Sequence, residues 1–267
     1  MSTLIRPELA RFLTRRVTWV GTLVTVLMMM IVSVLQVAEG SRSSLSTNGI
    51  GMVMVGTIFC SALGFFSAAS YIGSEQSSGA LGTWLTFNPR RMRVYAAKLL
   101  TITVPTAALT LISTLAGVGW AVLTTRQRSS RDGLVLELVG MSLRAVLVAA
   151  GFAVLGFVIA LIGRSTLSAL GVLVGYLVLV VLHAFAASAL NWYDRDWFGL
   201  ERIVGDFLMA TSRANYTTTV PTPGVRPGPV GPYFDYPTIL ATGAMWWVFL
   251  AVAVVIGGRV FSRRDLD

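Results

Sequence analysis

Residue types that perform chemistry are rare in this sequence and lie far apart. Among its 267 residues there is one cysteine, Cys60, one histidine, His183, and one lysine, Lys98. A lone cysteine excludes an intrachain disulfide and a multi-cysteine metal site, and a lone histidine excludes a zinc site with two histidines. A nucleotide-binding P-loop needs a lysine followed by serine or threonine, whereas Lys98 is followed by Leu99. We therefore expect no metal site, no cofactor site and no catalytic set, so that the chain is not an enzyme.

The composition indicates a membrane protein. Hydrophobic residues make up 55% of the chain and charged residues 12%, where soluble domains carry about 25% charged residues. Six apolar runs are long enough to cross about 30 Å of hydrocarbon. Each must be helical, because backbone groups in lipid have to hydrogen-bond within their own segment. The sequence thus predicts an all-α integral membrane fold with six transmembrane helices, at 17–38, 50–73, 99–123, 138–163, 167–190 and 238–258.

Basic residues flank these runs unevenly. With a cytoplasmic N-terminus, twelve Lys and Arg residues lie inside and eight outside, while Arg144 falls within the fourth run. Cytoplasmic loops carry the excess of basic residues in membrane proteins. We therefore expect a multi-pass protein of the inner or plasma membrane with both termini in the cytoplasm. The positive charge then reflects orientation, and we expect no nucleic-acid partner. Arg144 reaches the interface or pairs with Glu137, and contact with an anionic substrate is the alternative.

The first cytoplasmic segment, 1–16, has an amphipathic pattern. It predicts a helix that begins at Pro7 or just before it, with its arginines among the phosphates of the inner interface. The alternative is an ordinary basic flank of the first span.

A second amphipathic segment, 77–88, lies in the largest cytoplasmic loop. Its apolar face, formed by Leu81, Trp84 and Leu85, has helical spacing outside the membrane. An exposed apolar face of this kind normally contacts a partner, although Trp84 alone would also fit an interfacial position. Glu75, at the membrane end of the loop, is expected to pair with a cation of the partner, or with the neighbouring arginines Arg90 and Arg91.

The largest external segment, 191–237, changes character halfway. Its first half keeps helical periodicity, with Trp197 and Phe207 on one face, and predicts a short interfacial or re-entrant helix. Its second half is rich in proline and glycine and predicts turns. The alternative is a loop with no part in transport.

Small and polar residues in the fifth span supply further candidates. Gly171 and Gly175 form a pattern that favours close helix packing. His183 could relay protons, although a packed, hydrogen-bonded imidazole is the commoner role for such a residue. The candidates for a pathway or a subunit interface are therefore Gly171, Gly175, His183, Trp197, Phe198 and Phe207.

The junction between the second and third spans resembles the membrane subunit of ABC-2 type transporters. The string runs Gly73-Ser-Glu75-Gln-Ser-Ser-Gly79-Ala-Leu81-Gly-Thr-Trp84-Leu85-Thr-Phe-Asn-Pro89-Arg90-Arg91 and is followed by Ala97-Lys98. The two ends of the chain, Glu8-Leu-Ala-Arg11 and Phe261-Ser-Arg-Arg-Asp265, also look like the ends of that family. Residues 80–83 depart from its usual pattern. The positions that match the family motif are Glu75, Gly79, Leu81, Leu85, Pro89, Arg91 and Lys98.

The resemblance implies a permease subunit of an ATP-driven exporter. Its partners would be a separate ATPase subunit, which carries ATP and magnesium, a second permease subunit of the same or a related kind, and membrane lipid. Residues 1–16 would form an elbow helix at the membrane surface, 17–267 the six-helix transmembrane domain, and 77–88 the coupling helix that docks on the ATPase. The nearly uncharged spans favour a hydrophobic or amphipathic cargo such as a drug, peptide or lipid-like compound. The alternatives are a secondary transporter or channel that acts alone, and a membrane assembly factor.

Overall fold

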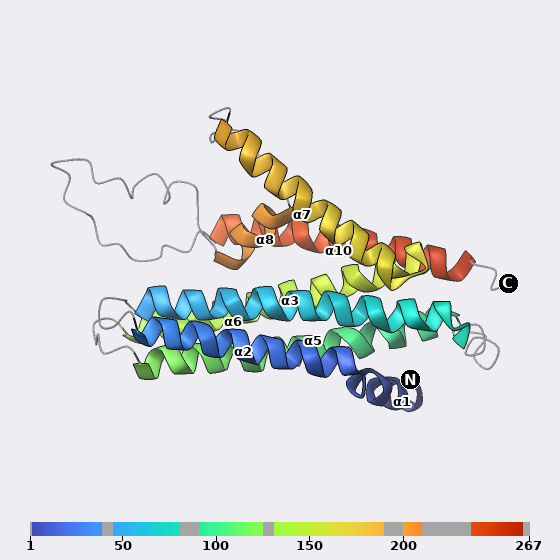
Figure 1. Ribbon diagram of the computed structural model, residues 1–267, viewed down its shortest axis with the longest axis horizontal. Coiled ribbons are helices and arrows are strands. Elements are labelled where there is room, and N and C mark those ends of the chain that lie inside the picture. The colour runs from blue at the N-terminus through green and yellow to red at the C-terminus, as the bar shows by residue number, and fades with distance from the viewer. Residues whose placement is uncertain are drawn as a thin grey trace. The chain divides into compact units, whose positions relative to one another are not determined.

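The computed structural model describes residues 2–38, 45–80, 91–124, 131–189, 200–209 and 236–263. Within these ranges every regular element is an α-helix. Two helices are short, α1 at Ser2–Leu13 and α8 at Leu200–Met209. The six long ones are α2 (Arg16–Ala38), α3 (Leu45–Ser77), α5 (Arg91–Thr124), α6 (Arg131–Gly163), α7 (Thr166–Ala189) and α10 (Tyr236–Arg263), as Figure 1 shows.

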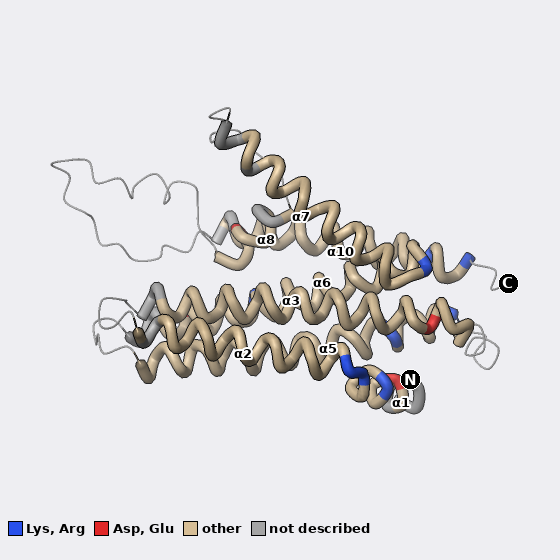
Figure 2. Tube along the Cα trace, viewed as in Figure 1, with Lys and Arg blue, Asp and Glu red and all other residues tan. Residues whose placement is uncertain are grey.

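All six long helices are long and apolar enough to cross a membrane. The predicted all-α, six-span architecture is therefore confirmed, and the chain is a multi-pass membrane protein. Figure 2 shows the long uncharged stretches along α2, α3 and α5.

The ends of several helices differ from the predicted spans. α5 has 34 residues and begins at Arg91 rather than near 99. At 1.5 Å per residue it is about 51 Å long, well beyond the 30 Å of hydrocarbon. Hydropathy detects only the part inside the lipid, so the polar first turns of α5 were missed. The predicted start of the first helix is also wrong, because α1 begins at Ser2 and continues through Pro7.

The chain divides into two compact units, and the larger one holds residues 1–179 and 250–267. Its core is formed by α3, α5 and α6. Glycines allow these helices to approach closely: a Cβ at Gly156 would collide with the backbone carbonyl of Phe65, and one at Gly64 would lie 2.6 Å from the methyl group of Thr106. Backbones that meet without intervening side chains are typical of helix packing in membranes.

Buried threonines on α5 satisfy their hydroxyls within the helix. Each donates a hydrogen bond to the carbonyl oxygen four residues earlier, at 2.7–2.9 Å, in the series Thr101, Thr106, Thr110 and Thr114. This pattern lets a polar side chain lie in an apolar core without a partner on another helix.

α2 turns most of its apolar side chains outward. Only 6% of its most apolar stretch is buried, against 56% and 61% for α3 and α6. An outward apolar face is expected of a helix that contacts lipid or another membrane subunit.

The smaller unit holds residues 180–249 and includes α8. The helix predicted in the first half of the external segment is thus present, at Leu200–Met209. Phe207 is buried against α10, where a Cβ at Gly243 would lie 2.9 Å from its ring. Trp197 and Phe198 lie outside the described residues.

Candidate functional site

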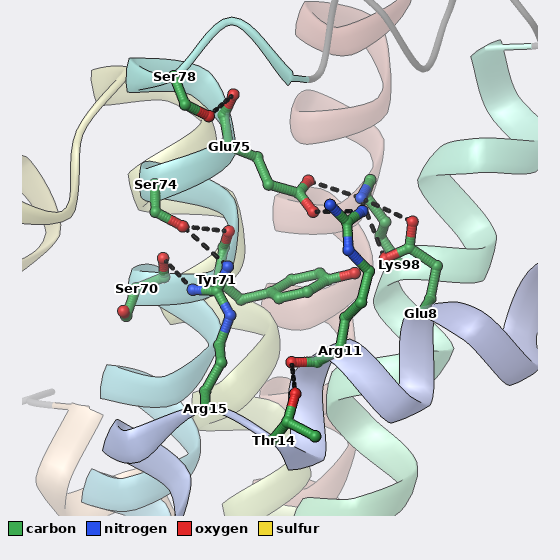
Figure 3. Close-up of polar contacts among 10 residues, drawn as sticks. All are labelled: Glu8, Arg11, Thr14, Arg15, Ser70, Tyr71, Ser74, Glu75, Ser78 and Lys98. Carbon is green, nitrogen blue, oxygen red and sulfur yellow. Dashed lines mark hydrogen bonds and ion pairs between the residues drawn. The ribbon is translucent and has the colours of Figure 1, made fainter.

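A cluster of buried charges joins three helices of the larger unit (Figure 3). The Nζ of Lys98 on α5 lies 2.6 Å from Oε2 of Glu75 on α3 and 3.3 Å from both carboxylate oxygens of Glu8 on α1. The three side chains are only 1%, 5% and 3% exposed, respectively. We call Glu8, Glu75 and Lys98 the ion cluster.

Two aromatic rings bring the carboxylates to Lys98. Glu8 and Phe12 are four residues apart on α1, and Tyr71 and Glu75 are four residues apart on α3, so each pair shares a helix face. The Phe12 ring packs edge-on against the Tyr71 ring, with centroids 5.7 Å apart. Lys98 Nζ in turn lies 4.9 Å from the centroid of Tyr71. The aromatic contact therefore sets the register in which both carboxylates meet one ammonium.

Two arginines, one in the last turn of α1 and one just after it, border the ion cluster. Arg11, whose side chain is 49% exposed, places Nη1 3.9 Å from Oε1 of Glu75. Arg15 lies in the break between α1 and α2, where Nη1 donates to the Ser70 carbonyl at 2.8 Å and Nη2 to the Ser74 hydroxyl at 2.9 Å. Burial lowers the pKa of the Arg15 guanidinium below its usual value, and the nearby Glu75 carboxylate partly opposes this shift.

The end of α3 is also held by the end of α6 and the start of α7. Gln76 Nε2 donates to the Leu161 carbonyl at 3.3 Å, and the Thr166 hydroxyl donates to the Ala69 carbonyl at 3.4 Å. Gly73 is required here, because a Cβ would lie 2.5 Å from the backbone nitrogen of Thr166. The last two turns of α3 therefore contact α1, α5, the end of α6 and the start of α7.

Gly79 follows directly with φ of +70°, and its N–H bonds to the Gln76 carbonyl at 3.3 Å. A glycine in this left-handed conformation commonly ends a helix, so the glycine of the sequence motif stops α3. The chain thus leaves a fixed helix end at the start of the segment 77–88.

The other motif residues are only partly placed. Leu81, Trp84, Leu85 and Pro89 lie outside the described residues. Arg91, which was expected near Glu75, donates instead to the Ser262 carbonyl at 3.1 Å. The carboxylate of Glu75 pairs with Lys98 and Arg11 rather than with Arg91, and Arg90, the other arginine expected there, lies outside the described residues.

The sequence also offered three candidates on α7. Gly171 and Gly175 are exposed, and no described atom lies within 4 Å of a Cβ built on either. His183 is partly exposed further along the same helix. Among the described residues the two glycines therefore do not form the close helix contact that their spacing favours.

Sequence reasoning noted Glu8 and Lys98 only within the family resemblance and did not pair them. A physical reason to pair them existed, because a carboxylate or ammonium next to an apolar helix must find an opposite charge. Comparisons with models of protein families and with curated proteins find no match to this chain. Among the described residues no group of three His, Cys, Asp or Glu side chains could hold a metal ion. The arrangement connects helices rather than forming a reactive site, because three helices share one buried ionic contact.

Proposed function

We propose that this chain is the membrane permease subunit of an ATP-driven ABC-2 type exporter, which moves a hydrophobic or amphipathic compound out of the cell. The observation that carries the proposal is the ion cluster, because it fixes the end of α3, just before the segment 77–88, to α1 and α5. A segment that receives force from a partner has to be joined rigidly to the helices it moves. Glu75 and Lys98 are also two of the positions at which the sequence resembles this family.

The energy source in this proposal is a separate ATPase subunit that docks on residues 77–88. The only lysine of the sequence is buried between two carboxylates, and the sequence around it is no P-loop. ATP and magnesium would therefore bind to the partner, and this chain would not be an enzyme by itself. A second permease subunit would complete the pathway, with α7 and its open glycines as a candidate interface.

The proposal places the chain in the inner or plasma membrane with both termini in the cytoplasm. In this orientation residues 1–16 form the elbow helix, and 77–88 and the ion cluster lie at the cytoplasmic end. The alternative function is a secondary transporter or channel that works alone, or an assembly factor. Solitary transporters use charged residues within the membrane, whereas the ion cluster lies in the last turn of α3 and the first turns of α5.

The proposal is tested by measuring how strongly the chain binds the ATPase after Trp84 is replaced. The tagged chain is purified from its native membranes, the ATPase is identified by mass spectrometry and by magnesium-dependent ATP hydrolysis, and recovery is compared at equal membrane levels. Trp84→Ala should weaken association by about 2 kcal/mol, roughly thirtyfold, as loss of a central aromatic contact does. Trp120→Ala, an exposed tryptophan on α5, is the matched control. Equal ATPase recovery with both variants would reject docking at 77–88, and recovery of no ATPase with the unaltered chain would reject the exporter function.

A further inference from the structure

Arg15 forms no ion pair with any carboxylate in the part of the chain that the structure describes. Both of its hydrogen-bond acceptors are neutral, namely the Ser70 carbonyl and the Ser74 hydroxyl. Its guanidinium carbon lies 4.9 Å from the centroid of Tyr71, which is also neutral. Among the described residues no carboxylate lies within ion-pair distance of Arg15.

The two nearby carboxylates already have cations of their own. Lys98 contacts Glu75 and Glu8 closely, and Arg11 approaches the second oxygen of Glu75. Two negative charges therefore face the two positive charges of Lys98 and Arg11, and Arg15 adds a third. Figure 3 shows its guanidinium beside Ser70 and Ser74, apart from the group around Lys98. Arg16, the next residue, is exposed and adds a further positive charge.

The position of the two arginines along the chain indicates their depth. The first apolar span begins at Arg16. Trp19 lies one turn further on and is 67% exposed, and tryptophans at the ends of spans typically lie at the level of the lipid headgroups. Arg15 and Arg16 are therefore at the depth of the lipid phosphates, where partly buried guanidinium groups bind phosphate oxygens strongly.

We propose that Arg15, in the break between α1 and α2, and Arg16, the first residue of α2, form a binding site for the phosphate of an anionic membrane lipid. The lipid supplies the negative charge that Arg15 lacks. The guanidinium of Arg15, which is oriented by its hydrogen bonds to Ser70 and Ser74, binds one side of the phosphate. The exposed side chain of Arg16 binds the other side. Occupancy of this site joins α1, α2 and α3 through one headgroup and so stabilises the end of the bundle that contains the ion cluster.

The experiment measures the thermal midpoint Tm of the full, delipidated chain in detergent micelles. Phosphatidylglycerol, phosphatidylcholine and inorganic phosphate are titrated separately. Phosphatidylglycerol at ten times its Kd should raise Tm by roughly 3–6 °C, while phosphatidylcholine and inorganic phosphate should produce less than a third of that shift. An equal shift with inorganic phosphate would overturn the lipid assignment, and an equal shift with phosphatidylcholine would overturn the need for an anionic lipid.

Variants separate this site from a general charge effect. The double variant Arg15→Gln/Arg16→Gln should raise the apparent Kd for phosphatidylglycerol at least tenfold, so that its Tm no longer shifts at the wild-type lipid concentration. Its matched control is Arg259→Gln/Arg263→Gln, which removes two exposed arginines near the end of α10 and should keep the wild-type shift. If the double variant does not fold, Arg16→Gln alone leaves the hydrogen bonds of Arg15 intact and should weaken binding about threefold. An unchanged Kd in the arginine variants, or an equal loss in the control, would disprove the site.

Discussion

At the residue scale, the Lys98 ammonium lies against three carboxylate oxygens. One belongs to Glu75 at 2.6 Å, and the other two are both oxygens of Glu8 at 3.3 Å. One positive charge is thereby shared between two carboxylates, and Arg11 supplies the second from the exposed side at 3.9 Å. Lys98 is therefore the member of the ion cluster whose loss leaves the largest uncompensated charge.

Replacing Lys98 by methionine should lower the free energy of unfolding by about 3–5 kcal/mol, because two carboxylates then remain buried beside apolar helices. The triple change Lys98→Met/Glu8→Gln/Glu75→Gln removes all three charges and should recover most of the loss. Thermal unfolding of the full chain in detergent measures both, with Arg93→Gln, an exposed residue of the same helix, as the control. A Tm of Lys98→Met equal to that of Arg93→Gln would contradict the stabilising role of the ion cluster.

The same residues mark the limit of prediction from sequence. Hydropathy located six spans, because lipid requires long apolar runs whatever their neighbours are. The partner of Glu75 could not be predicted in this way. Lys98, which pairs with both Glu75 and Glu8, lies on another helix, and the sequence does not specify how these helices pack. Of the two arginines expected to pair with Glu75, Arg91 donates instead to the Ser262 carbonyl, and Arg90 lies outside the described residues.

At the element scale, α3 and α6 form the closest helix pair of the larger unit. Gly156 lies against the backbone of Phe65, and Gly64 faces Thr106 and Ala149 across the same core. The second span contains Gly51, Gly56 and Gly64, but sequence alone does not distinguish glycines that pack from glycines that are open. Gly171 has the more familiar spacing with Gly175 and yet has no close neighbour among the described residues.

Gly156→Ala should therefore destabilise the chain by about 1–3 kcal/mol, because the added methyl group forces α3 and α6 apart. Gly119→Ala is the matched control, since a Cβ there meets no described atom within 4 Å and alanine favours the helix slightly over glycine. Thermal unfolding in detergent should give a lower Tm for the first variant and an unchanged or raised Tm for the second. Equal values would show that the two helices have room between them.

At the scale of the whole molecule, several helix ends that the basic residues assign to the cytoplasm lie near one another. Within the larger unit, α1 and the start of α5 meet the end of α3 at the ion cluster, and the end of α3 meets the end of α6 through Gln76 and Leu161. The start of α5 also meets the end of α10 through Arg91 and Ser262. Successive spans that cross the membrane in opposite directions would produce this grouping, because the end of one helix and the start of the next then lie on the same side.

The membrane orientation can be tested by labelling introduced cysteines from either side. Six spans would place both termini on one face, and the excess of twelve basic residues over eight predicts that this face is cytoplasmic. The native Cys60 is buried in α3 and is first replaced by serine, so that each labelled chain has one thiol. Ser2→Cys and Asp267→Cys should then react with a membrane-impermeant maleimide only in inverted vesicles or opened cells, whereas Thr222→Cys should react in intact cells. Reaction of Thr222→Cys from the cytoplasmic side alone would contradict the orientation, and reaction of the two terminal cysteines from opposite sides would require an odd number of spans.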